Sequence, residues 1–252
     1  MKIILEIWLL FKRRILETLR EPVWVLSGLM TPLLYIALFA PLLKNIGAIP
    51  LNTAQILDSF VPGILTLIAF GSGMGAGWVI IGDLQSGVIE RLRVSPASRF
   101  SILMGTILRD IVTFVVPSIL VILISWFLGF EVHILGLLVL IILLCCLTAI
   151  ISAWSDSLGL ILKQIGSLAA VVTGLQLPVT LLSGVLLPIS LGPNWLQFIA
   201  HINPLYYTVE ASRKLAAGMI ANSETLIAFC VIIPLMVLTL WWATRVYKKA
   251  IA

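Results

Sequence analysis

The segment 82–100 (GDLQSGVIERLRVSPASRF) gathers charged and hydroxyl side chains between two long apolar runs, and these side chains suit either a solvated loop or a contact with a cytoplasmic partner. The rest of the sequence has no G-x-x-x-x-G-K-[ST], G-x-S-x-G, H-E-x-x-H or C-x-x-C pattern. Its two histidines, His133 and His201, fall near the predicted outer surface, where we expect satisfied interfacial side chains. Cys145, Cys146 and Cys230 lie inside apolar runs and are expected to act as small hydrophobic side chains. We therefore expect no catalytic residue, metal site or cofactor site in this chain.

The elements that must position this segment are membrane helices. Only 11% of the 252 residues are charged, and the mean hydropathy is +1.16, whereas about a quarter of a soluble domain is charged. Apolar runs of about 20 residues cross a hydrocarbon core of about 30 Å, and lipid offers backbone groups no hydrogen-bond partners. We predict an all-α integral membrane protein, one transmembrane domain over residues 1–252, with spans at 23–43, 60–82, 111–130, 134–155, 168–187 and 225–244.

The distribution of basic residues predicts the orientation of these spans. Thirteen of the 16 lysines and arginines fall before span one, between spans two and three, after span four or after span six. Only Lys44, Arg213 and Lys214 fall on the other side. The positive-inside rule therefore places both termini and residues 82–100 in the cytoplasm. The net charge of +5 reflects this orientation and does not indicate a nucleic-acid partner.

Charged residues are absent from the six spans as predicted. Ion-driven transporters place ionisable side chains within the membrane, at considerable energetic cost, because proton or sodium chemistry requires them. Here the nearest such residues stand at the edges of the spans: Asp58, Asp83, Arg109, Asp110, Asp156 and Lys163. This pattern disfavours a secondary transporter or a voltage sensor. If the chain moves a solute, the energy must come from a partner.

Residues 2–20 form a predicted amphipathic helix at the membrane surface. At 100° per residue one stripe is apolar, with Ile4, Trp8, Phe11, Ile15 and Leu19. The opposite face carries Lys2, Glu6, Arg13, Glu17 and Arg20. Such a helix lies in the interface with its apolar side down. Two interpretations stay open: a simple anchor, or a lever that joins the membrane domain to motion in the cytoplasm.

Residues 84–95 form a second predicted amphipathic helix. Leu84, Val88 and Leu92 share one stripe, while Glu90 and Arg93 face away from it. Pro96 ends the helix and Ser98 is a candidate N-cap of the next one. A short cytoplasmic helix between two spans can dock on a partner and pass on rigid-body motion. The alternative is a helix that rests on the membrane with a solvated charged face.

The region after span five is apolar but broken by prolines and glycines. Over residues 188–218 we predict two short helices that enter the outer leaflet. Asn203 is the candidate N-cap of the second helix, with Pro204 in its first turn and Gly218 at its end. In span two, glycines recur over 71–77 at spacings of four residues, which favours close helix packing.

Two segments of this sequence resemble the membrane subunits of type-2 ABC exporters, in the branch of daunorubicin and other drug-export permeases. The first, 86–110, resembles a Gly-x-x-Glu-Arg-Leu stretch followed by a Ser/Thr-Pro turn, matched by Gly87, Glu90, Arg91, Leu92, Ser95 and Pro96. The second, 183–215, resembles an outer-leaflet signature, matched by Ser183, Gly184, Pro188, Pro193, Trp195, Leu196, Asn203, Pro204, Leu205, Tyr207 and Arg213. Tyr206 departs from the smaller Thr of many relatives.

The resemblance implies an exporter permease of the bacterial plasma (inner) membrane that pairs with a second permease subunit and with cytoplasmic ABC ATPases, which bind ATP and Mg. Residues 84–95 would be the coupling helix, and the helix 2–20 a second contact with the ATPase. The coupling contact would comprise Leu84, Gly87, Val88, Glu90, Arg91, Leu92, Arg93, Ser95 and Pro96. The outer gate would comprise Pro188, Trp195, Asn203, Pro204 and Tyr207.

The solute route is expected between the two permease subunits. Candidate lining residues on spans two and five are Phe70, Met74 and Gln176, for which ordinary packing is the alternative. An uncharged route fits lipophilic cargo such as drugs, antibiotics or lipids. Two other functions remain: a secondary transporter, and a non-transporting scaffold or sensor partnered with an ATPase.

Overall fold

The computed structural model describes residues 2–20, 30, 33–34, 37–38, 53–94, 98–185, 189 and 192–250, and these residues form helices and no strands. The N-terminal helix α1 (Lys2–Leu19) is followed by α3 (Thr53–Met74), α4 (Ala76–Gln85) and the short α5 (Val88–Arg93). Next come α6 (Arg99–Phe127), α7 (Ile134–Leu162) and α8 (Ile165–Leu181). The chain continues through α9 (Asn194–Ala200), α10 (Pro204–Ala216) and α11 (Ser223–Ala250). The prediction of an all-helical chain is confirmed for the described residues.

Four helical segments are long and apolar enough to cross a membrane: Phe60–Gln85, Arg99–Phe127, Ile134–Leu162 and Ser223–Ala250. They contain most or all of the predicted spans 60–82, 111–130, 134–155 and 225–244. The fifth predicted span, 168–187, is shorter than expected, because α8 has 17 residues and turns follow at 182–185. Predicted span one, 23–43, lies almost entirely outside the described residues.

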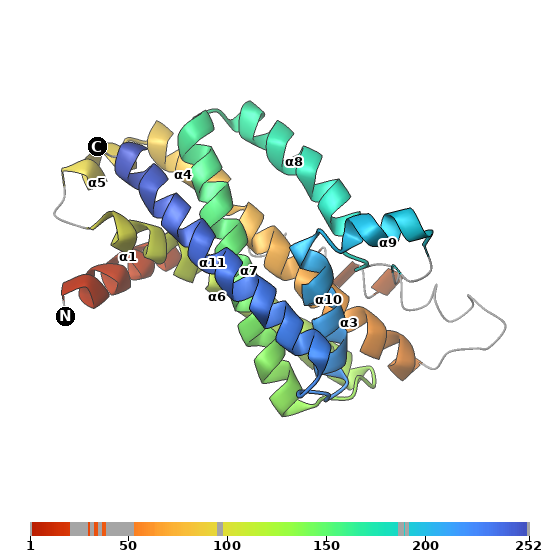
Figure 1. Ribbon diagram of the computed structural model, residues 1–252. Helices are drawn as coiled ribbons and strands as arrows, with labels where there is room; N and C mark the ends of the chain where they lie inside the picture. Colours follow the sequence, from red (N-terminus) through yellow and green to blue (C-terminus); the bar gives the residue numbers. More distant parts are fainter. Residues whose placement is uncertain are drawn as a thin grey trace.

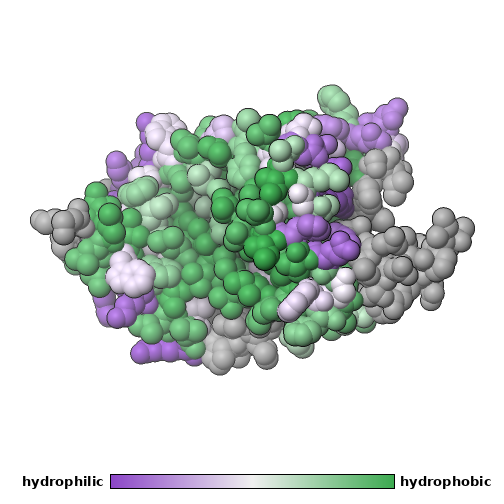
Figure 2. All heavy atoms as spheres, turned by 90° about the horizontal axis from the view of Figure 1, so that it is seen from below, coloured by the Kyte–Doolittle hydropathy of each residue, from purple (hydrophilic) through white to green (hydrophobic). Residues whose placement is uncertain are grey.

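Helix α7 packs against four other helices, α3, α4, α6 and α11 (Figure 1). Its inward side chains include Leu140, Leu143 and Leu144, which are fully buried. On the outer surface of the bundle, large apolar side chains such as Ile142 and Leu238 are exposed. Figure 2 shows apolar side chains over much of one face. A helix bundle with an apolar core and an apolar exterior is suited to lipid.

Small residues allow α4 and α7 to approach closely. The Gly77 N–H donates to Ser155 Oγ at 3.0 Å, and Ser155 Oγ donates to the Met74 carbonyl at 2.6 Å. A methyl group on Gly77 would lie 2.6 Å from the Ser155 carbonyl oxygen, closer than real Cβ atoms come. Gly71, in the same predicted glycine run, has open space around it. A methyl group on Gly73 would likewise lie 2.8 Å from Ile151 Cβ, so the packing role expected of these glycines falls on Gly73 and Gly77 and not on Gly71.

We expect Gly77→Ala to destabilise the protein by about 1–3 kcal/mol, because α4 and α7 must separate to admit the methyl group. Gly71→Ala is the matched control and should be neutral or slightly stabilising, since alanine favours a helix over glycine. Thermal unfolding of the purified proteins in detergent measures both. Equal unfolding temperatures for the two variants would contradict this account of the α4–α7 contact.

Candidate functional site

A short polar element, α5, lies at one end of the bundle, where both ends of the described chain also lie (Figure 1). Gly87 separates α4 from α5 with φ 71°, a left-handed conformation that glycine adopts without steric cost. The predicted single helix 84–95 was therefore wrong in its start, since Leu84 belongs to the end of α4. Ser95 and Pro96 lie outside the described residues.

The apolar stripe predicted to contact a partner faces this chain instead. Leu92 is 8% exposed and belongs to the hydrophobic core, and Leu84 and Val88 are half-buried against that core. These three apolar side chains, which were expected to contact the partner, therefore pack within the subunit. The exposed face of α5 carries Glu90 and Arg91, and Val94 directly after α5 is 86% exposed. Arg93 is the last residue of α5.

The start of α6 is fixed by Ser98 and by the N-terminal helix. Ser98 Oγ accepts from the Ser101 N–H at 3.0 Å, which confirms the predicted N-cap. The Glu6 carboxylate of α1 accepts from the Ser98 N–H and from Ser101 Oγ, both at 3.0 Å. A carboxylate at this position also complements the positive end of the α6 dipole. The polar face of α1 is thus in part a contact with α6.

A buried ion pair joins α1 to the end of α4. Arg14 of α1 pairs with Asp83 of α4, and the two residues are 6% and 8% exposed. Burial by itself lowers the pKa of the Arg14 guanidinium, but the hydrogen bond and charge of Asp83 raise this pKa above its ordinary value. The Arg14 guanidinium is therefore charged. Leu10, one turn before Arg14, packs against Gly105 of α6, where a methyl group would collide with it.

A second buried cluster lies between α6, α7 and α11. Arg109 pairs with Asp110, which also accepts from Ser152 Oγ of α7. Asp156 of α7 accepts from Thr106 Oγ1 at 2.8 Å and from the Tyr247 hydroxyl at 3.0 Å. The cluster thus links the three long helices through polar contacts: Thr106, Arg109 and Asp110 on α6, Ser152 and Asp156 on α7, and Tyr247 on α11.

The position of these charges differs from the prediction. Helix α6 begins at Arg99, well before the predicted span at 111, and α7 extends past 155 to Leu162. Arg109, Asp110 and Asp156 therefore lie inside long helices and are buried, and not at the edges of the membrane-crossing helices. Sequence analysis also missed Arg14, which was counted only as a basic residue. One signal was available: Asp83 directly follows an apolar span, and an ionisable residue at such a position is costly unless it has a partner.

At the opposite end of the bundle, the C-terminal end of α8 is held by a side chain of α10 and by the N-cap residue of α10. The Asn203 side chain caps α10 by accepting from the Leu205 N–H at 3.1 Å, and its amide donates to the Val179 carbonyl at 2.7 Å. Arg213 donates to the Gly184 carbonyl at 2.6 Å. The Tyr207 hydroxyl donates to the His201 carbonyl at 2.8 Å. The predicted cap and the presence of two short helices, α9 and α10, are confirmed, while their entry into the outer leaflet stays a prediction.

The remaining predicted residues divide between the surface and the core. Trp195 of α9 is 63% exposed, Pro204 opens α10, and Pro188 lies outside the described residues. Phe70 and Met74 are buried in this chain's own core, which favours ordinary packing for both. Gln176 of α8 is exposed. Among the described residues, no group of three or more His, Cys, Asp or Glu side chains could hold a metal ion.

The contacts behind α5 form a continuous connection between helices. Helix α4 continues into α5 after a two-residue turn, and Arg14 and Glu6 join α1 to α4 and to the start of α6. The candidate functional site is therefore the exposed face of α5 together with the ion pair and cap contacts behind it.

Comparison with known proteins gives consistent matches over most of the chain. Residues 5–216 match the family described as ABC-2 type transporter. The chain is 34% identical over 216 residues to the putative transport permease ycf38 of Cyanophora paradoxa, covering 83% of this chain and 73% of the relative. It is 23% identical over 230 residues to the daunorubicin resistance ABC transporter permease protein DrrB1 of Streptomyces coeruleorubidus, covering 90% and 81%. It is 27% identical over 207 residues to the inner membrane transport permease YadH of Escherichia coli strain K12, covering 81% and 77%.

We expect Arg14→Met to destabilise the protein by about 3–5 kcal/mol, because Asp83 is left buried without its cation. The double variant Arg14→Met/Asp83→Leu should recover most of this loss, since neither charge remains. Arg13→Met is the control: Arg13 forms an exposed pair with Glu17 at 2.8 Å, and its loss should cost less than about 1 kcal/mol. Unfolding in mixed micelles gives the free energies. A double variant no better than Arg14→Met would show that the pair is not the stabilising contact.

Proposed function

The chain belongs to the ABC-2 type transporter family, and from this premise we propose that it is the permease subunit of an ATP-driven exporter of lipophilic cargo. ABC-2 permeases are non-catalytic, multi-pass membrane components of ABC transporters and function with ABC ATPase subunits. The proposal adds the direction of transport, the class of cargo and the residues that receive the force.

The observation that carries the proposal is the exposed face of α5. Glu90 and Arg91 are exposed, whereas Leu92 on the other side of α5 is buried in the bundle. One side of the helix is therefore fixed to the membrane domain and the other is free for a partner. Buried apolar packing on the fixed side makes α5 a rigid extension of the bundle. Glu90 and Arg91 supply opposite charges that can orient an ATPase on it.

The same end of the bundle supports an orientation for the chain. Both ends of the described chain lie with α5 (Figure 1), and the sequence places thirteen basic residues on that side. The positive-inside rule supports a cytoplasmic location for this end. ATP and Mg are then bound by the ATPase below α5, and the relative YadH is itself named an inner membrane permease.

A second permease subunit fits against α8. This helix buries only Leu168 and Val172 and stands apart from the long helices (Figure 1). Its exposed side chains include Leu175, Gln176 and Leu177. Because Asn203 and Arg213 hold only one end of α8, we place a second copy, or a related chain, against its free side, with the cargo route between them. The apolar lining supports lipophilic cargo, in line with the drug-resistance names of relatives.

The mechanism is a change of packing driven by the partner. ATP binding closes the ATPase subunits, α5 moves with them, and the bundle changes from inward-open to outward-open. A shift of such an equilibrium from 1:99 to 99:1 takes about 5.5 kcal/mol of differential binding. The rigid connection from α5 to α4, α1 and α6 can carry a free energy of this size.

We expect efflux of a lipophilic dye from vesicles to require ATP and the ATPase subunit, and an ion gradient alone to drive none. In the same vesicles Glu90→Ala/Arg91→Ala should lower substrate-stimulated ATPase activity at least about tenfold, the effect of losing 1.4 kcal/mol of coupling. Glu131→Ala, an exposed carboxylate in the α6–α7 connection, is the control and should keep full activity. Gradient-driven efflux would favour the secondary transporter, and ATPase binding without efflux would favour the scaffold.

We expect Gly174→Cys on α8 to form cross-linked dimers with a short bis-maleimide, because a side chain at Gly174 has open space around it. The background lacks the native thiols Cys145, Cys146 and Cys230. Ile142→Cys on α7, at a position 57% exposed, is the control and should give monomers. Cross-linking at Ile142 and none at Gly174, with the cognate permease chains coexpressed, would place the interface elsewhere.

A further inference from the structure

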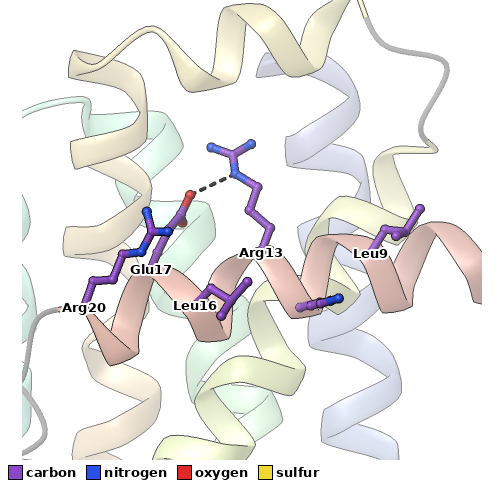
Figure 3. A pocket seen from close by; sticks show the side chains of 6 residues that line it. Leu9, Arg13, Leu16, Glu17 and Arg20 are labelled. Carbon is purple, nitrogen blue, oxygen red and sulfur yellow. Dashed lines mark hydrogen bonds and ion pairs between the residues drawn. The ribbon is translucent and has the colours of Figure 1, made fainter.

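A hollow of about 330 Å³ runs along the outward side of α1 (Figure 3). We call it the α1 groove; it is lined by Leu9, Lys12, Arg13, Leu16, Glu17 and Arg20. Three basic side chains, one carboxylate and two leucines thus share one surface. The function proposed above does not use this surface.

The orientation of α1 is fixed by the side chains that it directs into the bundle, away from the α1 groove. Arg14 is buried against Asp83, and Leu10 packs against Gly105. A rotation of α1 that turned the groove inward would remove Arg14 from its buried carboxylate. The groove therefore remains outward-facing, and its occupant must come from outside the described part of this chain.

The α1 groove contains more basic side chains than carboxylates. Arg13 pairs with Glu17 at 2.8 Å, and Figure 3 shows this pair on the same side of α1 as Arg20. Lys12 and Arg20 are exposed, and neither forms an ion pair within the described residues. Lys12 and Arg20 lie about two helical turns apart on one surface, and two cations without an ion-pair partner among the described residues attract anionic groups. A phosphate group offers several acceptor oxygens.

The surface next to these cations is apolar. Leu9 and Leu16, inside the groove, are 57% and 47% exposed. The neighbouring stripe of α1 continues with Ile4, Trp8 and Leu19, which are 74%, 57% and 65% exposed. An acidic protein surface would neutralise the cations but would leave this stripe in water. A phospholipid satisfies both, with its phosphate on the cations and its acyl chains on the leucines.

We propose that the α1 groove binds an acidic phospholipid, with Lys12 and Arg20 holding the phosphate and Leu9 and Leu16 contacting the acyl chains. This gives α1 a role in lipid recognition beyond simple anchoring. Since Arg14 and Glu6 connect α1 to α4 and α6, lipid in the groove fixes the depth at which the α5 end of the bundle lies. The site does not depend on the ATPase.

The test uses the full chain, without the ATPase, in phosphatidylcholine nanodiscs that contain either brominated phosphatidylglycerol or brominated phosphatidylcholine. Bromine quenches nearby tryptophan, and Trp8 lies on the exposed stripe next to the groove. The chain has eight tryptophans, so the Trp8 signal is taken as the difference between the wild type and Trp8→Phe. We expect brominated phosphatidylglycerol to quench Trp8 at lower mole fraction than brominated phosphatidylcholine. Removal of Lys12 or Arg20 should weaken this preference about fivefold for each cation.

The matched control for Lys12→Gln/Arg20→Gln is Lys248→Gln/Lys249→Gln, which removes two exposed cations from the end of α11. The control should keep the full preference, whereas the groove variant should lose it. Equal quenching by the two lipids in the wild type, or equal losses in the two variants, would overturn the proposal. It would also fail if excess inorganic phosphate abolished the preference, since the groove would then bind a free anion. A groove variant that keeps the lipid preference but no longer copurifies with the ATPase would assign this surface to the partner protein.

Discussion

The ion pair between Arg14 and Asp83 is the contact on which the α5 end of the molecule depends. A buried charge that loses its partner costs several kcal/mol, so α1 and α4 can pack together only in the arrangement that keeps Arg14 against Asp83. The same helix accepts hydrogen bonds at the start of α6 through Glu6. Four elements, α1, α4, α5 and α6, are thereby connected into one unit. The proposed coupling requires this rigid connection, because a force applied to a flexible attachment would not reach the bundle.

Within lipid, helices gain little from the hydrophobic effect when they associate, because the surrounding acyl chains are as apolar as leucine. Close packing of small residues and specific polar contacts must therefore hold the bundle together. Gly77 against Ser155 is the first kind of contact, and Asp110 with Ser152 is the second. Helix α8 has few contacts of either kind with the described residues, and that deficit is the reason for expecting a partner there.

Local signals in the sequence predicted local structure well. The N-caps Ser98 and Asn203 were recognised because a capping side chain acts on backbone groups two or three residues away. The stripe Leu84, Val88 and Leu92 shows the limit of such signals. Amphipathic spacing identified the side that avoids water, but it did not say whether the bundle or a partner covers that side. For the same reason Phe70 and Met74 were named as candidate route residues with ordinary packing as the alternative, and in the structure they lie in the core.

The sequence by itself determined the class of the protein, the helical character of its membrane segments and the side on which its basic residues gather. Hydropathy and charge bias are sums over neighbouring residues, so they need no knowledge of the fold. Only the tertiary structure decided which charges are paired, since Arg14 and Asp83 are 69 positions apart and Asp156 and Tyr247 are 91 apart. A buried ion pair depends on two side chains meeting in space, and no local pattern fixes that meeting.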